Sequence, residues 1–120
     1  MRSNWVEHKG KKIFYQDFSK HFYNSAAVKT ELSEVQKVVM SQPLNSVRVL
    51  SDFRDTNVGS DLLSAMNSAS AATKAYVNKT AVLGVTGMKR KLADLLTALT
   101  GQPLKYFDNI EAAKDWLVED

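Results

Sequence analysis

Hydrophobic and polar residues alternate near the start of the chain, as they do in β-strands. The segment WVEHKGKKIFYQDFS predicts two short strands around a tight turn at Lys9-Gly10, because glycine readily takes the positive φ that such a turn needs. The alternation gives the second strand two faces, with Ile13, Tyr15 and Asp17 on one and Phe14, Gln16 and Phe18 on the other. The chain is therefore expected to begin with a hairpin.

The spacing of apolar residues becomes helical in SAAVKTELSEVQKVVMSQP. Apolar side chains recur there every three or four positions and form one stripe: Val28, Leu32, Val35 and Val39. Charged residues lie off this stripe, so Lys29, Glu31, Glu34 and Lys37 are expected to face water. Pro43 ends the helix, because the residue before a proline avoids helical geometry.

Strand-like and helix-like segments alternate through the rest of the chain. Three further strands are expected in SVRVLSDF, TAVLGVTG and LKYF. Helices are expected at about residues 60–77, in MKRKLADLLTALTG, and in DNIEAAKDWLVED, where Asp108 and Glu111 have capping-box spacing. In the last helix a buried stripe is expected, with Trp116 mostly buried: Ile110, Ala113, Trp116 and Leu117.

The predicted order is β-β-α-β-α-β-α-β-α, which indicates the α/β class. Strands that alternate with helices favour parallel crossovers, and with the hairpin they predict a mixed five-stranded sheet with helices packed on it. No linker or repeat is visible, and 120 residues suit one domain, so residues 1–120 are expected to form a single domain.

Composition narrows the possible functions. Cysteine is absent, and His8 and His21 are far apart in sequence, so no disulfide or ligand-spaced metal motif is seen. A formal net charge of +3 mainly favours solubility, with a preference for anionic lipid or nucleic acid as the alternative. No run of about 18 apolar residues and no segment like a signal peptide occurs. The chain is therefore expected to be cytoplasmic, with peripheral membrane contact left open.

The segment AVLGVTGMKRK invites comparison with a phosphate-binding loop. Only two residues separate Gly84 from Gly87, Met88 stands where that loop has lysine, and no third glycine completes a dinucleotide-binding fingerprint. We therefore expect no ATP or GTP binding. A weaker anion site is possible at Thr86, Gly87, Lys89 and Arg90, where free N–H groups at a helix start would favour an anion. The simpler alternative is that the basic side chains point to water, and that Gly84 only lets a helix pack closely on the strand.

Two carboxylates, Asp52 and Asp55, are expected at the end of a central strand, where open α/β sheets place their sites. They could hold Mg²⁺ or serve as acid and base, but turn chemistry and a salt bridge with Arg54 explain them more simply. No hydrolase or metalloprotease motif is present. Neither an enzymatic activity nor a cofactor is therefore predicted.

Aromatic residues gather in FYQDFSKHFYN. Phe18, Phe22 and Tyr23 are candidate contacts for a ligand or a membrane, and a homodimer interface or a cap on the core would also explain them. No RNA-binding strand motif accompanies them, so no nucleic-acid partner is predicted. Ser60 lies at the expected start of the second helix, where a hydroxyl is usually an N-cap and phosphorylation is the less favoured alternative.

Four segments together resemble one known family: Asp17-Phe18-Ser19, SVRVLSDF at 46–53, AVLGVTG at 81–87 and FDNIEAAKDWL at 107–117. The chain resembles the SpoIIAA-like family, small bacterial proteins with the STAS fold of anti-sigma-factor antagonists. The resemblance covers nearly the whole chain and implies a STAS-like fold without catalytic residues.

The resemblance also implies two kinds of partner. The antagonists carry Asp-Ser-Ser-Gly at the start of the second helix, with a serine that a partner kinase phosphorylates. Here the stretch is Val58-Gly59-Ser60-Asp61, so Ser60 is the nearest match and the motif is not intact. The family is similar in shape to CRAL-TRIO lipid carriers, which implies an apolar ligand or contact with a membrane.

Three hypotheses follow. The first is a non-enzymatic module that binds an apolar or amphipathic small molecule, a lipid or a membrane surface, between the first helix and the sheet or beside the second helix. The alternative is a protein-interaction regulator of the anti-sigma-factor-antagonist type, switched or not at Ser60. A small enzyme that uses Asp52 and Asp55 is the third.

Overall fold

The computed structural model describes residues 1–85 and 103–119. Five strands form one sheet in the order β1-β2-β3-β4-β5: β1 (Asn4–His8), β2 (Lys11–Asp17), β3 (Val47–Asp52), β4 (Val77–Leu83) and β5 (Leu104–Phe107). β1 is antiparallel to β2, and the other neighbours are parallel. The mixed five-stranded sheet and the α/β class predicted from the sequence are confirmed.

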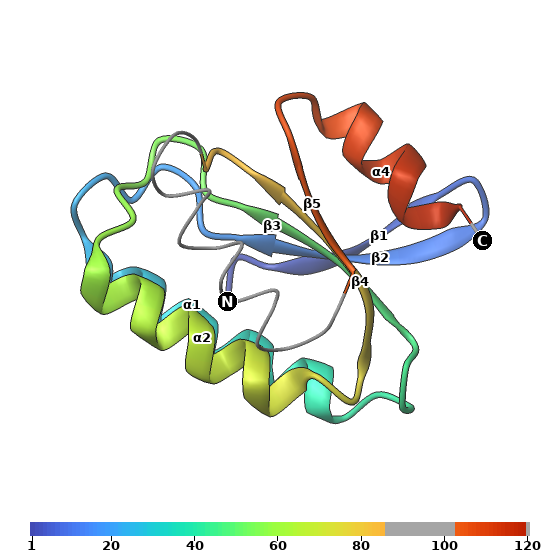
Figure 1. Ribbon diagram of the computed structural model, residues 1–120, viewed down its shortest axis with the longest axis horizontal. Coiled ribbons are helices and arrows are strands. Elements are labelled where there is room, and N and C mark those ends of the chain that lie inside the picture. Colours follow the sequence, from blue (N-terminus) through green and yellow to red (C-terminus); the bar gives the residue numbers. More distant parts are fainter. Residues whose placement is uncertain (86–102, 120) are drawn as a thin grey trace.

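The described helices lie on opposite faces of the sheet (Figure 1). α1 (Ser25–Met40) and α2 (Ser60–Thr73) run side by side on one face, and α4 (Ile110–Val118) covers the other. The helix expected in MKRKLADLLTALTG lies outside the described residues. The remaining elements follow the predicted order, and the parallel strands β2 to β5 all begin at the same end of the sheet.

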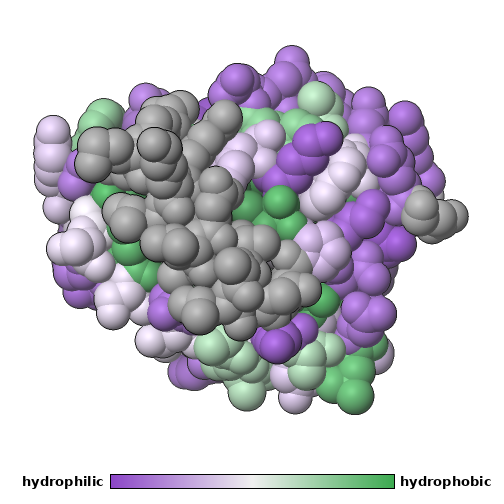
Figure 2. Space-filling model, viewed as in Figure 1, coloured by the Kyte–Doolittle hydropathy of each residue, from purple (hydrophilic) through white to green (hydrophobic). Residues whose placement is uncertain are grey.

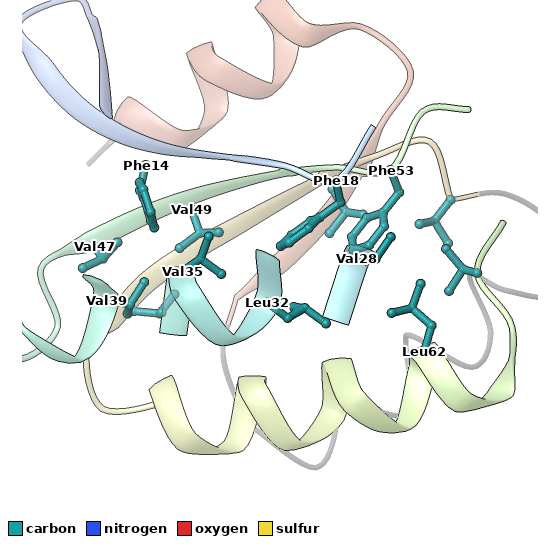
Figure 3. Close-up of a cluster of buried hydrophobic side chains, with 14 residues drawn as sticks. Phe14, Phe18, Val28, Leu32, Val35, Val39, Val47, Val49, Phe53 and Leu62 are labelled. Carbon is teal, nitrogen blue, oxygen red and sulfur yellow. The ribbon is translucent and has the colours of Figure 1, made fainter. Parts of the chain in front are cut away.

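Strand alternation divides the buried side chains into two cores. The larger core lies between the sheet and α1 and α2, and it contains the whole predicted stripe of α1 (Figure 3). The smaller core joins the other face of the sheet to Ala113 and Leu117 of α4. Trp116 packs against this smaller core beside Phe107, with ring centroids 5.7 Å apart, and its intermediate exposure agrees with the expectation that it would be mostly buried.

Two helix boundaries differ from the prediction. α2 ends at Thr73 rather than near residue 77, because the next residues pair with the start of β3. The carbonyl of Ala75 accepts a hydrogen bond from Asn45 N, and that of Tyr76 accepts one from Val47 N. In α4 the N-cap is Asn109, whose side chain accepts from Ala112 N, rather than the predicted Asp108.

Gly84 is required by a close approach of two backbones. It has a φ of +84°, and a Cβ atom there would lie 2.4 Å from Arg54 N and 2.6 Å from Phe53 C. The tight contact is therefore with the loop after β3, while the helix that was expected to pack on this strand lies outside the described residues. By contrast Gly10, in the predicted hairpin turn, has a φ of +79° and no atom within 4 Å of its Cβ position.

These two glycines give a matched test of the close approach. Gly10→Ala should destabilise the protein by about 1–2 kcal/mol, the cost of a left-handed non-glycine residue. Gly84→Ala should cost clearly more, because the backbone at Phe53 and Arg54 must also move. Urea unfolding measures both. Equal losses of stability would show that the approach of the two backbones is not limiting.

Candidate functional site

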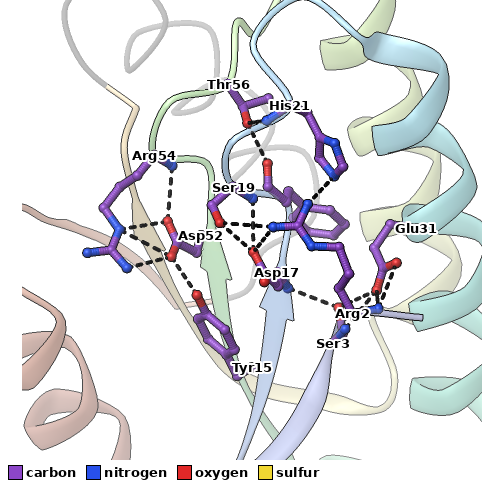
Figure 4. A network of polar contacts seen from close by, with 11 residues as sticks. Arg2, Ser3, Tyr15, Asp17, Ser19, His21, Glu31, Asp52, Arg54 and Thr56 are labelled. Carbon is purple, nitrogen blue, oxygen red and sulfur yellow. Dashed lines mark hydrogen bonds and ion pairs between the residues drawn. The ribbon is translucent and has the colours of Figure 1, made fainter.

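The loops that follow β2 and β3 are joined at the carboxyl end of the parallel strands. Their backbones continue the pairing of the sheet through four hydrogen bonds: Phe18 N to Asp52 O (3.0 Å), Lys20 N to Arg54 O (2.9 Å), Phe22 N to Asp55 O (2.9 Å) and Asn57 N to Phe22 O (2.6 Å). Thr56 strengthens the joint, since its Oγ1 donates to Phe18 O at 2.6 Å and accepts from His21 N at 3.1 Å (Figure 4). The two loops therefore form one well-defined unit.

Phe22 and Tyr23 are displayed on this unit. Their exposed fractions are 62% and 85%, among the largest of the apolar side chains in the described part of the chain. Phe22 has a φ of +50°, an unfavourable left-handed conformation that the hydrogen bonds of its own N–H and C=O maintain. Phe18, the third aromatic candidate, is instead buried and stacked on Phe53, with centroids 4.9 Å apart.

The start of α2 lies at the same end of the molecule as these loops (Figure 1). Asp61 pairs with Lys29 of α1 at 3.2 Å, which ties together the first turns of the two helices. Ser60 is exposed, but the N-cap is Gly59, and the helix start has no side-chain cap hydrogen bond. The expected capping role of the Ser60 hydroxyl is therefore wrong. The residue remains a candidate phosphoacceptor.

A buried carboxylate anchors the base of the loops. Asp52 is fully buried and accepts hydrogen bonds from Tyr15 Oη at 2.6 Å and from Arg54 Nη2 at 2.7 Å (Figure 4). Burial alone would raise the pKa of Asp52, but the hydrogen bonds from Arg54 and Tyr15 outweigh it and hold that pKa below its ordinary value. Asp52 is therefore charged at neutral pH.

Asp52 and Asp55 have different surroundings. The oxygens of Asp52 are engaged by Tyr15 and Arg54, whereas Asp55 is exposed on the loop, with a φ of +58°. Within residues 1–85 and 103–119, no group of three or more His, Asp or Glu side chains could hold a metal ion. The geometry matches the salt bridge that the sequence offered as the simpler explanation.

Glu31 holds the N-terminal segment against α1. Although the helical pattern placed it toward water, its side chain is buried and accepts hydrogen bonds from Ser3 Oγ at 2.6 Å and Ser3 N at 2.9 Å. Burial tends to raise the pKa of Glu31, but the hydrogen bonds from Ser3 and from Arg2 N prevail and lower it. The partners are 28 and 29 residues away in the sequence, so a local pattern could not reveal this contact.

A cavity of about 110 Å³ lies between the sheet and helices α1 and α2. Most of the side chains that line it are apolar, including Phe18, Leu32, Val35, Val49, Phe53 and Leu63. Gln16 and Ser51 are polar exceptions on its sheet side, and Ser51 Oγ donates to Gln16 Oε1 at 3.1 Å. The outer surface differs in character, since hydrophilic side chains cover much of the face in Figure 2, with separate hydrophobic patches between them.

The family comparison covers both the loop unit and the cavity walls. A SpoIIAA-like family model matches residues 15–118. The chain belongs to the SpoIIAA-like family. The matched range runs from β2 through α4, and the sheet with its helices is consistent with a STAS-like fold, as the resemblance implied. Searches among curated proteins and among solved structures each found no match.

The structure places some of the predicted site residues and leaves others undescribed. The anion-site residues Thr86, Gly87, Lys89 and Arg90 lie outside the described residues. No helix in the described ranges is long and apolar enough to cross a membrane. The structure thus brings together Phe22, Tyr23 and the start of α2, and it places Phe18 at the cavity instead.

The Glu31 contact predicts how stability depends on pH. Because its folded-state pKa is lowered, its contribution to stability is present above the ordinary carboxyl pKa of about 4.5 and is lost as pH falls through the folded-state value. Glu31→Gln should therefore melt at a lower temperature than wild type at pH 7, and the difference should shrink below about pH 4.5.

Glu34→Gln is the matched control for thermal melts across this pH range. Glu34 is in the same helix and pairs with the N-terminal ammonium at 3.5 Å, but it is partly solvent-exposed, so little stability should be lost. A difference between wild type and Glu31→Gln that stays constant down to pH 3 would contradict the role of the charged carboxylate.

Proposed function

We propose that this SpoIIAA-like protein is a non-enzymatic module that binds a protein partner through the surface formed by Phe22, Tyr23 and the start of α2. The observation that supports this most is the display of two large aromatic side chains on a hydrogen-bonded backbone. Exposed Tyr and Phe are enriched in protein interfaces, where they supply much apolar contact area. The family assignment agrees with an interaction role.

The fixed geometry of the loops favours binding. Ordering a loop on association reduces affinity, so a surface already held in one conformation binds more tightly for the same contacts. Here the left-handed conformations of Lys20, Phe22 and Asp55 are maintained by backbone hydrogen bonds between the loops. Such unfavourable conformations occur often at functional sites.

The charges around the aromatic pair favour a protein over a membrane. Lys20 and Arg54 are exposed on these loops, and so are Asp55 and Asp61. A rim with both signs of charge suits a protein interface, whereas anionic lipid attracts clusters of basic residues. The basic residues 89–91, which would assist membrane binding, lie outside the described residues. Membrane contact and self-association are therefore treated as alternative outcomes of the test.

A second candidate function is the binding of a small apolar or amphipathic molecule. The cavity supports it, because small-molecule sites are concave, mostly apolar and supplied with a few polar groups. This function does not compete with the first, since the cavity lies between the sheet and the two helices and the aromatic pair is exposed on the loops.

The aromatic pair is tested by Phe22→Ala combined with Tyr23→Ala. A photo-crosslinking amino acid in place of Tyr23, in cells that contain the protein, should capture a specific partner. The purified partner should then bind the double variant at least tenfold more weakly than wild type, because truncating central aromatic residues commonly costs about 2 kcal/mol or more each. Thermal stability should change little, since both side chains are exposed.

Leu44→Ala is the matched control for calorimetric binding. Leu44 is another large apolar side chain, 69% exposed, in the segment between α1 and β3. Crosslinks from position 44 to the same partner, or equal affinity of wild type and double variant, would contradict the proposed surface. Binding to anionic vesicles that needs the aromatic pair would favour a membrane, and a crosslinked homodimer would favour self-association.

Phosphorylation of Ser60 is the regulation that the proposed surface suggests. A phosphate would add about −1.5 to −2 charges at a helix start, which tolerates anions, so the fold should persist while the surface changes. Ser60→Asp should weaken binding of the purified partner severalfold without lowering the melting temperature. Ser64→Asp, also exposed but one turn later in α2, should leave affinity unchanged. Equal affinity for both variants and wild type would argue against a switch at Ser60.

A further inference from the structure

Gln16 and Ser51 form a polar pair inside the larger core. They are direct partners in the parallel pairing of β2 and β3. Strand alternation points them toward α1 and α2, on the same face as the buried aromatics Phe14, Phe18 and Phe53. The Gln16 side-chain carbonyl accepts the Ser51 hydroxyl hydrogen at 3.1 Å. This hydrogen bond fixes the position of the Gln16 amide.

The amide nitrogen of Gln16 is available to a bound molecule. Gln16 is 9% exposed and lines the cavity. Among residues 1–85 and 103–119, its Nε2 donates no hydrogen bond, since Gln16 takes part in the Ser51 contact only through Oε1. This donor can therefore give a hydrogen bond to an acceptor on a molecule in the cavity.

We propose that the cavity binds a compact, mostly apolar molecule with a carbonyl oxygen that accepts a hydrogen bond from Gln16 Nε2. The inference rests on the second candidate function above and specifies the chemistry of its ligand. The apolar walls bury the hydrocarbon part, while Gln16 Nε2, held in place by Ser51, orients the oxygen. A volume of about 110 Å³ suits a small ring, since an engineered apolar cavity of about 150 Å³ holds benzene.

Two probe molecules of nearly equal shape distinguish recognition of the carbonyl oxygen from burial of the hydrocarbon. Cyclohexanone and methylenecyclohexane differ only in the oxygen or CH₂ that the ring carries. Each is titrated into the full-length protein, and binding is followed by NMR chemical shifts of the methyl groups that line the cavity. Both should bind wild type, with shifts at Leu32, Val35 and Val49. The ratio of their dissociation constants reports recognition of the oxygen.

The ratio is then compared between two glutamine variants. Gln16→Leu keeps the side-chain size but removes the donor, so the preference for cyclohexanone should fall by about three- to tenfold, the usual worth of one hydrogen bond. Gln36→Leu is the matched control, because Gln36 of α1 also lines the cavity while its Nε2 contacts Met40 Sδ at 4.0 Å. This second change should leave the ratio unaltered. If Gln16→Leu does not fold, Gln16→Met replaces it in the same comparison.

The outcomes distinguish the ligand site from its chemistry. If neither probe binds, the cavity is filled by water or by the chain's own side chains, and both the ligand-binding function and the proposed ligand chemistry are wrong. If both probes bind but their ratio is the same in Gln16→Leu and wild type, the cavity is a ligand site and the role of Gln16 is wrong. An equal loss of preference in Gln36→Leu would also overturn that role.

Discussion

The hydrogen bonding between β2 and β3 continues into the loops that follow the two strands, and this continuation positions residues of both candidate sites. The Phe18 N–H donates to Asp52 O, and the hydrogen bonds then pass along the two loops as far as Phe22 and Asn57. Loops usually vary in conformation because their backbones bond to water. Here the backbones bond to each other, so the aromatic pair is presented on a backbone that hydrogen bonds to the neighbouring loop hold in place.

A buried charge supports this arrangement from below. The Asp52 carboxylate is charged because Arg54 and Tyr15 donate to it, and Arg54 keeps part of its guanidinium in water. Removing Arg54 would leave the buried Asp52 carboxylate without an opposite charge, which is strongly unfavourable. The second constraint is Gly84, whose missing side chain lets β4 lie against the backbone at Phe53 and Arg54. The Asp52–Arg54 ion pair and the close approach at Gly84 together fix the start of the loop between β3 and α2.

Local sequence patterns were enough to predict most of the architecture. The alternation of side chains in Ile13–Phe18 and the apolar stripe from Val28 to Val39 can each be read within a single strand or helix. The structure contains both patterns. The errors arose where a distant segment decides the outcome. α2 ends early because residues 75 and 76 pair with the start of β3, and Glu31 is buried because Ser3 supplies hydrogen bonds. The candidate surface was partly predictable for the same reason: the exposed Phe22 and Tyr23 stood out, but their pairing with the other loop did not.

Phe18 connects the two candidate functions physically. Its ring stacks on Phe53 and lines the cavity, while its backbone carbonyl accepts from Thr56 Oγ1 in the loop unit. A molecule in the cavity that displaced this ring would disturb the residue that anchors the loops, whereas one that left the ring in place would not. Replacing Phe18 would therefore disturb both sites and the core at once. Substitutions of Gln16, or of Phe22 and Tyr23, leave Phe18 in place. Only such substitutions can separate binding in the cavity from binding at the surface.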